Sequence, residues 1–543
     1  MVAFDFQDRR FGDSAKTASG NGPWRTGDAA REPPGGRATL RACVDAARCG
    51  TCGAGRSSSY PLRPRAMVLL SENWPMQQLT MIRTILSLFL LAAATLRAGA
   101  PVYAALWFDT EDYIEPAADD AALRIARDLT GLGVRATFKV VGEKARVLEQ
   151  RGRWDVVRAL ALHDIGYHSN FHSVQPTPAL YLRDLGYVEG AAEFERREGP
   201  GVLDLARIFG VRPSCYGQPG NSWAPQSNAA LRHMGIPVYL DEGSQIGLND
   251  QPFWYGGLLH IYNMGRFQLR APLDGDEPVA KSNERFERAA AELASHGGGV
   301  ISMYYHPTEF VTTEFWDAVN FAKGANPERT AWRRPRRRTE AESERCYGIL
   351  HDYVAHAKGV PGVRFVTARE LLQLYGSPAP AQAERARIAA HMSPRQTFLV
   401  TEGGALSAAD MLLSLLGMRP EVVDGPATRI ASNLEGASIP RAAFERAKTD
   451  AVSSIGANKR LPAAVWIGAE KLSIGDFAAT LAGDDGVAAE IVVRRANLEF
   501  EKYFSNEPRK TFDWPIHPEG FSAPELLELG KLQGWTLKPA RLR

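Results

Sequence analysis

Two histidines four residues apart, His168 and His172, are the first candidates for chemistry in this sequence. On one turn of helix their imidazoles would share a face and could reach a single metal ion. With 11 histidines in 543 residues, chance supplies about 0.2 such pairs, so the spacing alone is weak evidence. The pair gains weight because it follows a short apolar run, 164–167, which is typical of a buried strand end.

Further groups suited to hydrolysis follow two other apolar runs. The cluster Asp109-Thr110-Glu111-Asp112 comes after the first strand-like run, and His306 comes after a later one. Carboxylates and imidazoles of this kind can supply metal ligands, a general base and a general acid. The set therefore predicts a metal-dependent hydrolase.

The elements that must position these groups alternate between strands and helices from residue 102 onward. Alternation predicts parallel strands joined by crossover helices, and seven or eight such units in about 275 residues favour a closed (β/α) barrel over an open sheet. We expect strands at 102–108, 136–141, 164–167, 214–217, 237–240, 258–262, 300–304 and 363–366, and helices that include 117–132, 143–161, 179–209, 283–295 and 340–357.

Functional residues of barrels collect where the strands end. Five candidates directly follow an apolar run: Asp109, His168, Gln218, Asp241 and His306. Their shared position predicts that they line one pocket. For Asp241 two interpretations stay open, because an aspartate at a strand end can orient catalytic groups or cap a helix.

Length and charge narrow the class of protein. A chain of 543 residues is too long for one core, so two or more domains are expected. The 64 basic and 62 acidic side chains nearly cancel, which gives no global sign of nucleic-acid binding. We interpret the basic run at 329–338 as a solvated loop in preference to a contact for an anionic polymer.

Residues 81–100 have the pattern of a signal peptide: a short charged start, about ten apolar residues and an Ala-x-Ala ending. The apolar run is too short to span a membrane comfortably. We interpret residues 1–80 as the product of a start codon placed too early, with translation beginning at Met76 or Met81. The alternative is a disordered leader followed by an internal anchor. The pattern predicts export to the periplasm, the cell envelope or the medium.

Cysteine usage does not predict a disulfide framework. Cys43, Cys49 and Cys52 fall in the doubtful leader, which leaves Cys215 and Cys346 in a mature chain. We interpret these two as buried thiols.

The sequence Ser377-Pro-Ala-Pro380 ends the alternation, so we place a linker at 376–395 between a barrel domain, 101–375, and a smaller domain, 396–543. Amphipathic stretches at 408–416, 441–455 and 474–481 predict that the smaller domain is mainly helical. It has no cluster of acids and histidines. Polymer binding and simple packing on the barrel both remain open as its role.

Residues 101–375 resemble the polysaccharide deacetylase family, the NodB-homology domain of carbohydrate esterase family 4. The resemblance implies a distorted (β/α) barrel, one divalent metal ion with Zn²⁺ as the preferred ion, and an N-acetylated polysaccharide as substrate. Five motifs carry it in order: Phe108-Asp-Thr-Glu-Asp112, Ala136-Thr-Phe138 with Val141-Gly142, His168-Ser-Asn-Phe-His172, Tyr216-Gly-Gln-Pro-Gly-Asn-Ser-Trp223 and Tyr305-His-Pro307.

The resemblance also implies a role for each residue of the site. Asp109 would be the general base and His306 the general acid, with the metal on His168 and His172. Independently of the resemblance, Trp223 is a candidate for stacking on a sugar ring and Asp241 for orienting catalytic groups, although aromatic residues at barrel rims belong to the core as often.

Two positions depart from the family pattern. The family commonly has adjacent aspartates, whereas this chain has Asp109, Glu111 and Asp112, so Glu111 and Asp112 both remain candidates for the third metal ligand. Gln218 stands where the family offers an arginine that orients the base. Glutamine carries no charge, so the pKa of Asp109 would be set differently.

Three functions are compatible with these motifs. The first is a deacetylase of an envelope or extracellular polysaccharide. The second is a carbohydrate-binding pseudoenzyme that lost turnover at Gln218, and the third is a hydrolase of another linear amide. The presence of Asp109, His168, His172 and His306 together favours an enzyme, because a binding module needs no such set. No protein partner is implied.

Overall fold

The computed structural model describes residues 100–419, 421–434 and 438–543. All of them belong to one compact unit, Gln77–Arg543. The predicted leader, the start codon and residues 81–99 of the predicted signal peptide lie outside the described residues.

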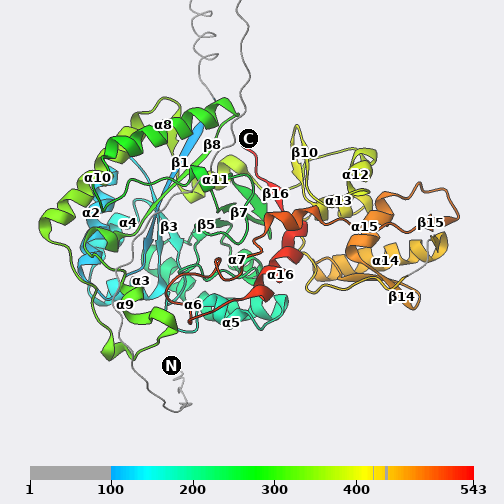
Figure 1. Ribbon diagram of the computed structural model, residues 1–543, viewed down its shortest axis with the longest axis horizontal. Coiled ribbons are helices and arrows are strands. Elements are labelled where there is room, and N and C mark those ends of the chain that lie inside the picture. The colour runs from blue at the N-terminus through cyan, green and yellow to red at the C-terminus, as the bar shows by residue number, and fades with distance from the viewer. Residues whose placement is uncertain (1–99, 420, 435–437) are drawn as a thin grey trace, which may run out of the picture. The chain divides into compact units, whose positions relative to one another are not determined.

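A mixed sheet positions the candidate residues. Its strands are β1 (Val102–Thr110), β2 (Thr137–Val140), β3 (Asp164–Tyr167), β4 (Cys215–Tyr216), β5 (Val238–Leu240), β6 (Phe253–Tyr255), β7 (Leu258–Ile261), β8 (Gly299–Tyr305), β9 (Val363–Phe365) and β16 (Lys538–Pro539). Their order is β16-β6-β7-β5-β4-β3-β2-β1-β8, and β9 also pairs with β1. Figure 1 labels β1, β3, β5, β7, β8 and β16 of this sheet. Strand β1 is buried along its whole length and is parallel to β2, β8 and β9.

The α/β class is as predicted, but the sheet is not the regular closed barrel that the alternation suggested. Strand β6 is antiparallel to β7, and β16 is antiparallel to β6. Strand β8 is linked to the segment after β7 by one parallel bridge, Gln268 to Ser302, instead of a ladder. The antiparallel pairing of β6 and β7 follows from the hairpin turn between them. Gly256 and Gly257 form this turn with φ values of 55° and 77°.

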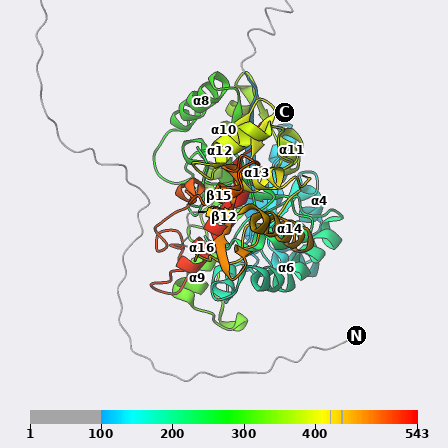
Figure 2. The ribbon, with the colours of Figure 1, turned by 90° about the vertical axis from the view of Figure 1, so that its right-hand side faces the viewer.

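Helices surround the sheet (Figures 1 and 2). They are α2 (Ala117–Gly131), α3 (Gly142–Gln150), α4 (Trp154–Leu160), α5 (Pro178–Leu182), α6 (Tyr187–Phe209), α7 (Gln226–His233), α8 (Val279–Ser295), α9 (Trp316–Phe321), α10 (Glu340–Gly359) and α11 (Ala368–Tyr375). The stretches predicted at 143–161 and 179–209 are each divided into two helices. Helix α10 begins at a capping box of Thr339 and Glu342, which satisfies otherwise free N–H groups.

Side chains alternate along β1 and so separate two parts of the core. Leu106 and Phe108 pack with the surrounding helices, whereas Tyr103 and Trp107 join residues of β5, β7 and β8. Because successive strand residues point to opposite faces, Asp109 shares the face of Trp107. The strand therefore directs Asp109 to the face opposite the helix-packed core.

Residues after 376 form a second core and then return to the sheet. The elements are α12 (Arg385–Met392), β10 (Leu399–Thr401), β11 (Gly404–Leu406), α13 (Ala408–Leu415), β12 (Ser438–Pro440), α14 (Arg441–Asn458), β13 (Ala464–Ile467), β14 (Glu470–Ser473), α15 (Ile474–Ala482), β15 (Glu490–Val492) and α16 (Pro524–Gln533). Three two-stranded sheets accompany these helices. The boundary at 376–395 and the mainly helical character of 396–543 remain predictions.

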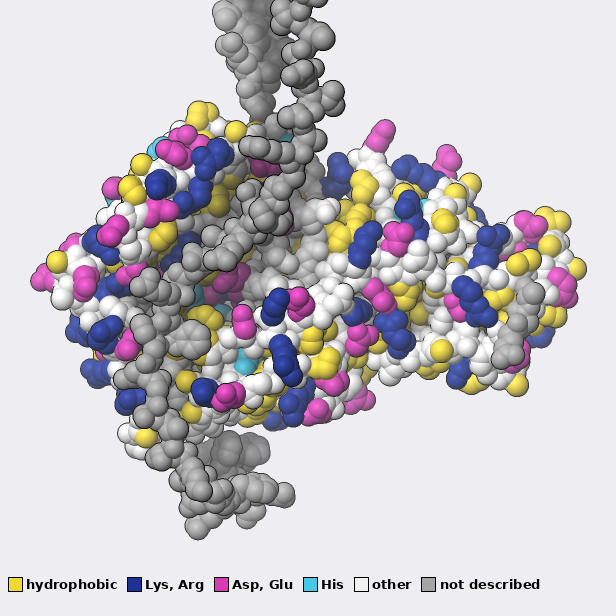
Figure 3. Space-filling model, in the orientation of Figure 1, with side chains coloured by type: hydrophobic (Ala, Val, Ile, Leu, Met, Phe, Trp, Pro, Cys, Tyr) yellow, Lys and Arg dark blue, Asp and Glu magenta, His cyan; other side chains and the backbone are white. Residues whose placement is uncertain are grey.

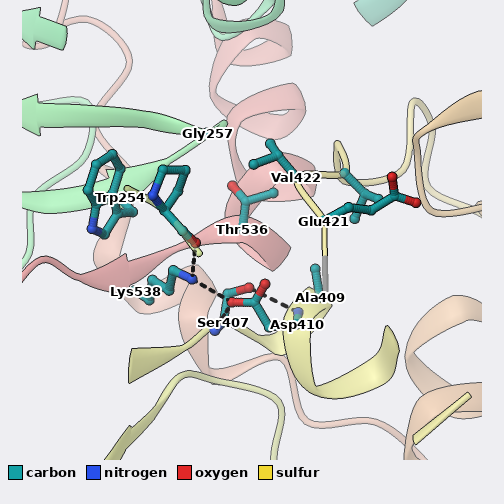
Figure 4. Close-up of a pocket in the computed structure, with 11 residues that line it drawn as sticks. Trp254, Gly257, Ser407, Ala409, Asp410, Glu421, Val422, Thr536 and Lys538 are labelled. Atoms are coloured by element: carbon teal, nitrogen blue, oxygen red, sulfur yellow. Dashed lines mark hydrogen bonds and ion pairs between the residues drawn. The ribbon is translucent and has the colours of Figure 1, made fainter. Parts of the chain in front are cut away.

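The returning segment is joined to both cores. Phe512 and Leu526 pack in the first core, and β16 pairs with β6. The Nζ atom of Lys538 donates to the Pro378 carbonyl at 2.6 Å and pairs with Asp410 Oδ2 at 2.7 Å (Figure 4). The last 40 or so residues are thus part of the fold that carries the site.

Several minor predictions can be compared with the structure. Cys215 and Cys346 are buried free thiols, as predicted. His163, a histidine outside the candidate site, has a structural role, because its Nδ1 accepts from the Ala136 N–H at 3.2 Å and its Nε2 faces the Ala126 carbonyl at 2.9 Å. Among the described residues no helix is long and apolar enough to cross a membrane.

The basic run at 329–338 is partly tied to the protein's own acids. Arg329 pairs with Glu143 at 2.6 Å, and Arg338 pairs with Asp274 at 2.7 Å. On the face seen in Figure 3, basic and acidic side chains are interspersed over the described surface.

Candidate metal and catalytic site

Glu111, His168 and His172 converge on one point. Glu111 Oε2 lies 2.8 Å from His172 Nε2 and 3.3 Å from His168 Nε2. All three residues are buried, and their potential ligand atoms lie within 4.8 Å of one another. Two imidazoles and one carboxylate form a donor set that suits Zn²⁺ and leaves coordination positions open.

The protonation of the two imidazoles fits a metal ion. His168 Nδ1 lies 3.1 Å from the Gly217 carbonyl, which can only accept, so Nδ1 carries the proton and Nε2 presents a lone pair. His172 Nδ1 lies 2.6 Å from Ser173 Oγ, and its buried Nε2 faces Glu111 Oε2 at 2.8 Å. Lone pairs facing a carboxylate are stabilised by a cation between them, so these residues fit a bound metal.

The charges of the cluster agree with this geometry. Burial alone would raise the pKa of the Glu111 carboxyl, but His172 and His168 hold that pKa well below its usual range. Burial lowers the pKa of His168, which favours its neutral form. Burial also acts to lower the pKa of His172, but Glu111 outweighs it and raises that pKa. Because metals bind neutral imidazoles and ionised carboxylates, a metal ion would displace a proton from His172.

A loop, not a helical turn, brings the histidines together. Residues 168–172 follow β3, and Ser169 and His172 have left-handed φ values of 63° and 56°. Ser169 Oγ accepts a hydrogen bond from the His172 N–H at 2.9 Å, and the two imidazole centroids are 4.9 Å apart. The expectation of one helical face is therefore wrong, although both imidazoles reach Glu111.

Asp112 lies outside the cluster and stabilises a loop. Its Oδ1 accepts from the Ile114 and Glu115 N–H groups, each at 2.9 Å, and its Oδ2 accepts from Thr308 Oγ1 at 2.9 Å. With both oxygens engaged, burial raises the pKa of Asp112 to about 6. Of the two acids left open by the sequence, the geometry favours Glu111 as the metal ligand.

Helix α9 supplies contacts that hold the ligands in place. Trp316 Nε1 donates to Glu111 Oε1 at 3.1 Å. Ser173, which contacts His172, donates to Asp317 Oδ2 at 3.4 Å, and Trp514 Nε1 donates to the same oxygen at 2.7 Å. Such contacts orient metal ligands. Trp514 belongs to the returning C-terminal segment.

Asp109 is adjacent to the ligand cluster and is held by Lys139. Asp109 Oδ1 lies 3.5 Å from His168 Nδ1 and 2.9 Å from Lys139 Nζ. Lys139 Nζ also lies 3.0 Å from Asp241 Oδ2. Asp241 therefore acts through Lys139, and the described chain after it is not helical, so the capping interpretation is wrong.

Gln218 is near these groups but bonds elsewhere. Its Oε1 accepts from Tyr239 OH at 2.8 Å, and its Nε2 faces Tyr262 OH at 3.1 Å and the Glu242 carbonyl at 3.4 Å. The amide of Gln218 is thus bonded to Tyr239, Tyr262 and the Glu242 backbone.

His306 lies on the other side of Asp109. Its Nε2 is 3.7 Å from Asp109 Oδ2, and its Nδ1 is 3.1 Å from Glu309 Oε1. Burial lowers the pKa of His306, but Glu309 outweighs it and, with Glu111 and Asp109, raises that pKa to about 9. Ordinary neutral conditions therefore leave His306 protonated, as a general acid requires.

Trp223 does not belong to the site. Its side chain is completely buried in the first core, and its ring lies against Gly530 of α16. The prediction that it binds or orients a substrate is wrong, because the returning segment covers it.

The chain was compared with known proteins. No family model and no curated protein matches it. About half of the chain is similar to solved structures of polysaccharide deacetylases and related hydrolases at low identity. A protein from Mycobacterium smegmatis described as a putative polysaccharide deacetylase is 16% identical, with a TM-score of 0.32, over 51% of this chain and 91% of that one.

Two further structures have similarly low sequence identities and TM-scores. A family 4 acetyl xylan esterase from Clostridium thermocellum, solved with a cobalt ion, is 15% identical with a TM-score of 0.27, over 51% of this chain and 93% of its own. An allantoinase, Puue, is 13% identical with a TM-score of 0.34, over 50% and 91%. At these scores the proposed function rests on the side chains of this chain and not on the similarities.

Sequence reasoning missed several residues of the site, among them Lys139, Glu309 and Trp316. Lys139 stands within an otherwise apolar strand, Thr137–Val140, and a charge in such a run is a signal that could have identified it. Glu309 follows His306 by three residues, a spacing that places both on one turn. Trp316 carries no comparable signal, because its contact with Glu111 spans 205 positions.

The geometry predicts which acid holds the metal. Glu111→Gln should lower the metal content of the purified protein to near zero, because the substitution removes the anionic ligand. Asp112→Asn is the matched control and should keep about one ion. Elemental analysis of both variants, together with His168→Ala and His172→Ala, measures this. Full metal content in Glu111→Gln and loss in Asp112→Asn would assign the ligand to Asp112.

Proposed function

We propose that this protein is an exported, metal-dependent deacetylase that removes N-acetyl groups from an envelope or extracellular polysaccharide, with Zn²⁺ as the resident ion. One observation carries the proposal. A candidate base, Asp109, lies between a three-residue ligand set and a candidate acid, with 3.5 Å to His168 Nδ1 and 3.7 Å to His306 Nε2. Amide hydrolysis needs these functions within one site.

The chemistry follows from the positions of the side chains. When bound to Glu111, His168 and His172, a divalent cation supplies Lewis acidity, which polarises a carbonyl and makes water a stronger acid. Asp109 would accept the proton that the attacking water loses, through Oδ2, since Oδ1 is held by Lys139. His306 would donate a proton to the sugar nitrogen as the C–N bond breaks. The products are acetate and a free amine.

Acetate release tests the proposal. Purified protein is incubated with peptidoglycan, chitin oligomers and an acetylated exopolysaccharide, with and without added Zn²⁺. Release from at least one polymer, abolished by chelation and restored by metal, is the expected result. Binding of a polymer without release of acetate would favour the carbohydrate-binding pseudoenzyme. Release of ammonia or another amine from a small linear amide alone would favour the third function.

Export is a separate part of the proposal. It is supported by the signal-peptide pattern at 81–100. We expect the mature protein to begin between Ala98 and Pro101 and to be recovered outside the cytoplasm. N-terminal sequencing of the native protein checks this, and a mature chain that retains residues 1–80 would contradict it.

A further inference from the structure

We propose that Lys139 is the positioning residue of Asp109, and that it takes the place of the charged side chain missing at position 218. The inference rests on the proposed function, because it concerns Asp109 as a general base. Four features of the site support it: register, space, charge and the orientation of Gln218.

The register of the sheet places Lys139 beside Asp109. In the parallel pair of β1 and β2, Asp109 is opposite Lys139. The Lys139 side chain is completely buried, and its Nζ reaches Asp109 Oδ1 at 2.9 Å and Asp241 Oδ2 at 3.0 Å. The ammonium also lies 4.0 Å from the centroid of the Trp107 ring, which is a favourable cation–π distance.

Two glycines make room for this side chain. Gly166 is opposite Lys139 on β3, and a Cβ atom there would lie 2.9 Å from Lys139 Cγ. A Cβ atom at Gly217 would collide with the Lys139 ammonium. Gly217 directly precedes Gln218, so the strand end that lacks a charge at 218 also leaves space for an ammonium that extends from β2 past β3.

The ammonium lies where a second cation would otherwise fit. Asp109, His168 and Asp241 have potential ligand atoms within 4.8 Å of one another. Lys139 already bridges the two carboxylates of that group. Burial would lower the pKa of Lys139, but Asp109 and Asp241 together raise it above its usual value, so the bridge is charged. This geometry predicts one metal ion per chain and not two.

Gln218 does not compete for this role. Its amide is bonded to Tyr239 and Tyr262. The two functions of a charged residue at 218, fixing the base and balancing its charge, therefore fall to Lys139. Lys139 contacts neither Glu111 nor His172 in the described ion pairs, so its loss should affect the base and not the ligand set.

Charge-balanced variants separate a positioning role from a structural one. Lys139→Met leaves two buried carboxylates without a counter-ion and should lower both thermal stability and kcat. Lys139→Met/Asp241→Asn removes one positive and one negative charge together, so the midpoint of thermal unfolding should largely recover. Its kcat should stay lower than that of the wild type by about 100-fold, with little change in KM, because Asp109 is no longer fixed. Asp241→Asn is the matched single variant and should be at least about tenfold more active than the double variant.

Metal content and structure complete the test. All variants should bind as much zinc as the wild type by elemental analysis, and crystals of metal-free Lys139→Met/Asp241→Asn should show the Asp109 carboxylate in a new position. A stable double variant with wild-type kcat would overturn the proposal. If the wild type releases no acetate from any polymer, the proposed function fails. The crystal structure of the double variant then tests the positioning role of Lys139 by itself. An unmoved Asp109 carboxylate in that structure would overturn the inference.

Discussion

Asp109→Asn should lower the rate of acetate release by about three orders of magnitude while the protein keeps its metal. The substitution preserves the shape of the side chain but removes its ability to accept a proton. The ligand set is Glu111, His168 and His172, and Asp109 approaches it only at His168 Nδ1, 3.5 Å away, the nitrogen that does not face the metal position. Steady-state kinetics and elemental analysis of the same preparation measure the two effects.

The neighbouring acid provides the control for this experiment. Asp112 is equally buried, but its oxygens bond the Ile114 and Glu115 N–H groups and Thr308. Asp112→Asn should therefore change stability more than kcat. If Asp109→Asn retained the rate of an active wild type, Asp109 would not be the base. If it lost the metal, the loss of activity would say nothing about proton transfer.

The sequence predicted the residues at strand ends because the rule behind them is local. An apolar run ends, and the next polar residue emerges at the edge of a parallel sheet. Asp109, His168 and Asp241 all follow this rule, and the structure brings them together. The strand at Asp164–Tyr167 was located at its observed bounds for the same reason.

The parts that the sequence could not supply depend on contacts between distant segments. Trp316 and Trp514 reach the site from positions more than 140 residues beyond the His168–His172 loop, and no local pattern encodes such contacts. Trp223 was wrongly assigned to the substrate site because its burial depends on α16, more than 300 residues away. The hairpin of β6 and β7 was missed although Gly256-Gly257 is a recognised turn signal.

His306 depends on a partner that can be removed without touching the ligand set. Glu309 Oε1 lies 3.1 Å from His306 Nδ1, and Glu309 Oε2 lies 2.6 Å from Arg270 Nη2. Burial would raise the pKa of Glu309, but Arg270 and His306 lower it to about 2, so it is ionised at neutral pH. The other acids that face His306 are Asp109 and Glu111 at the end of β1, and Glu242 after β5.

Glu309→Gln should move the alkaline limb of kcat to lower pH. A general acid works only while protonated, so activity is present below the pKa of His306, about 9, and is lost as the pH rises through it. Without the Glu309 charge, burial lowers that pKa, and activity at pH 8 should fall by about tenfold for each pH unit that the limb moves. Glu314→Gln, a nearby exposed acid, is the control and should leave the limb in place.

The same substitution should change how stability depends on pH, and this readout needs neither metal nor substrate. The pKa of His306 in the folded protein, about 9, is above its ordinary value of roughly 6.5. Its contribution to stability is therefore fully present below about pH 6.5 and is lost as the pH rises through 9. In metal-free Glu309→Gln that loss should become smaller and move to lower pH, because Glu111 and Asp109 still raise the pKa of His306. Thermal unfolding at intervals from pH 6 to 9.5, with His306 followed by NMR, measures it. An unchanged His306 titration in this variant would show that Glu309 does not keep the acid protonated.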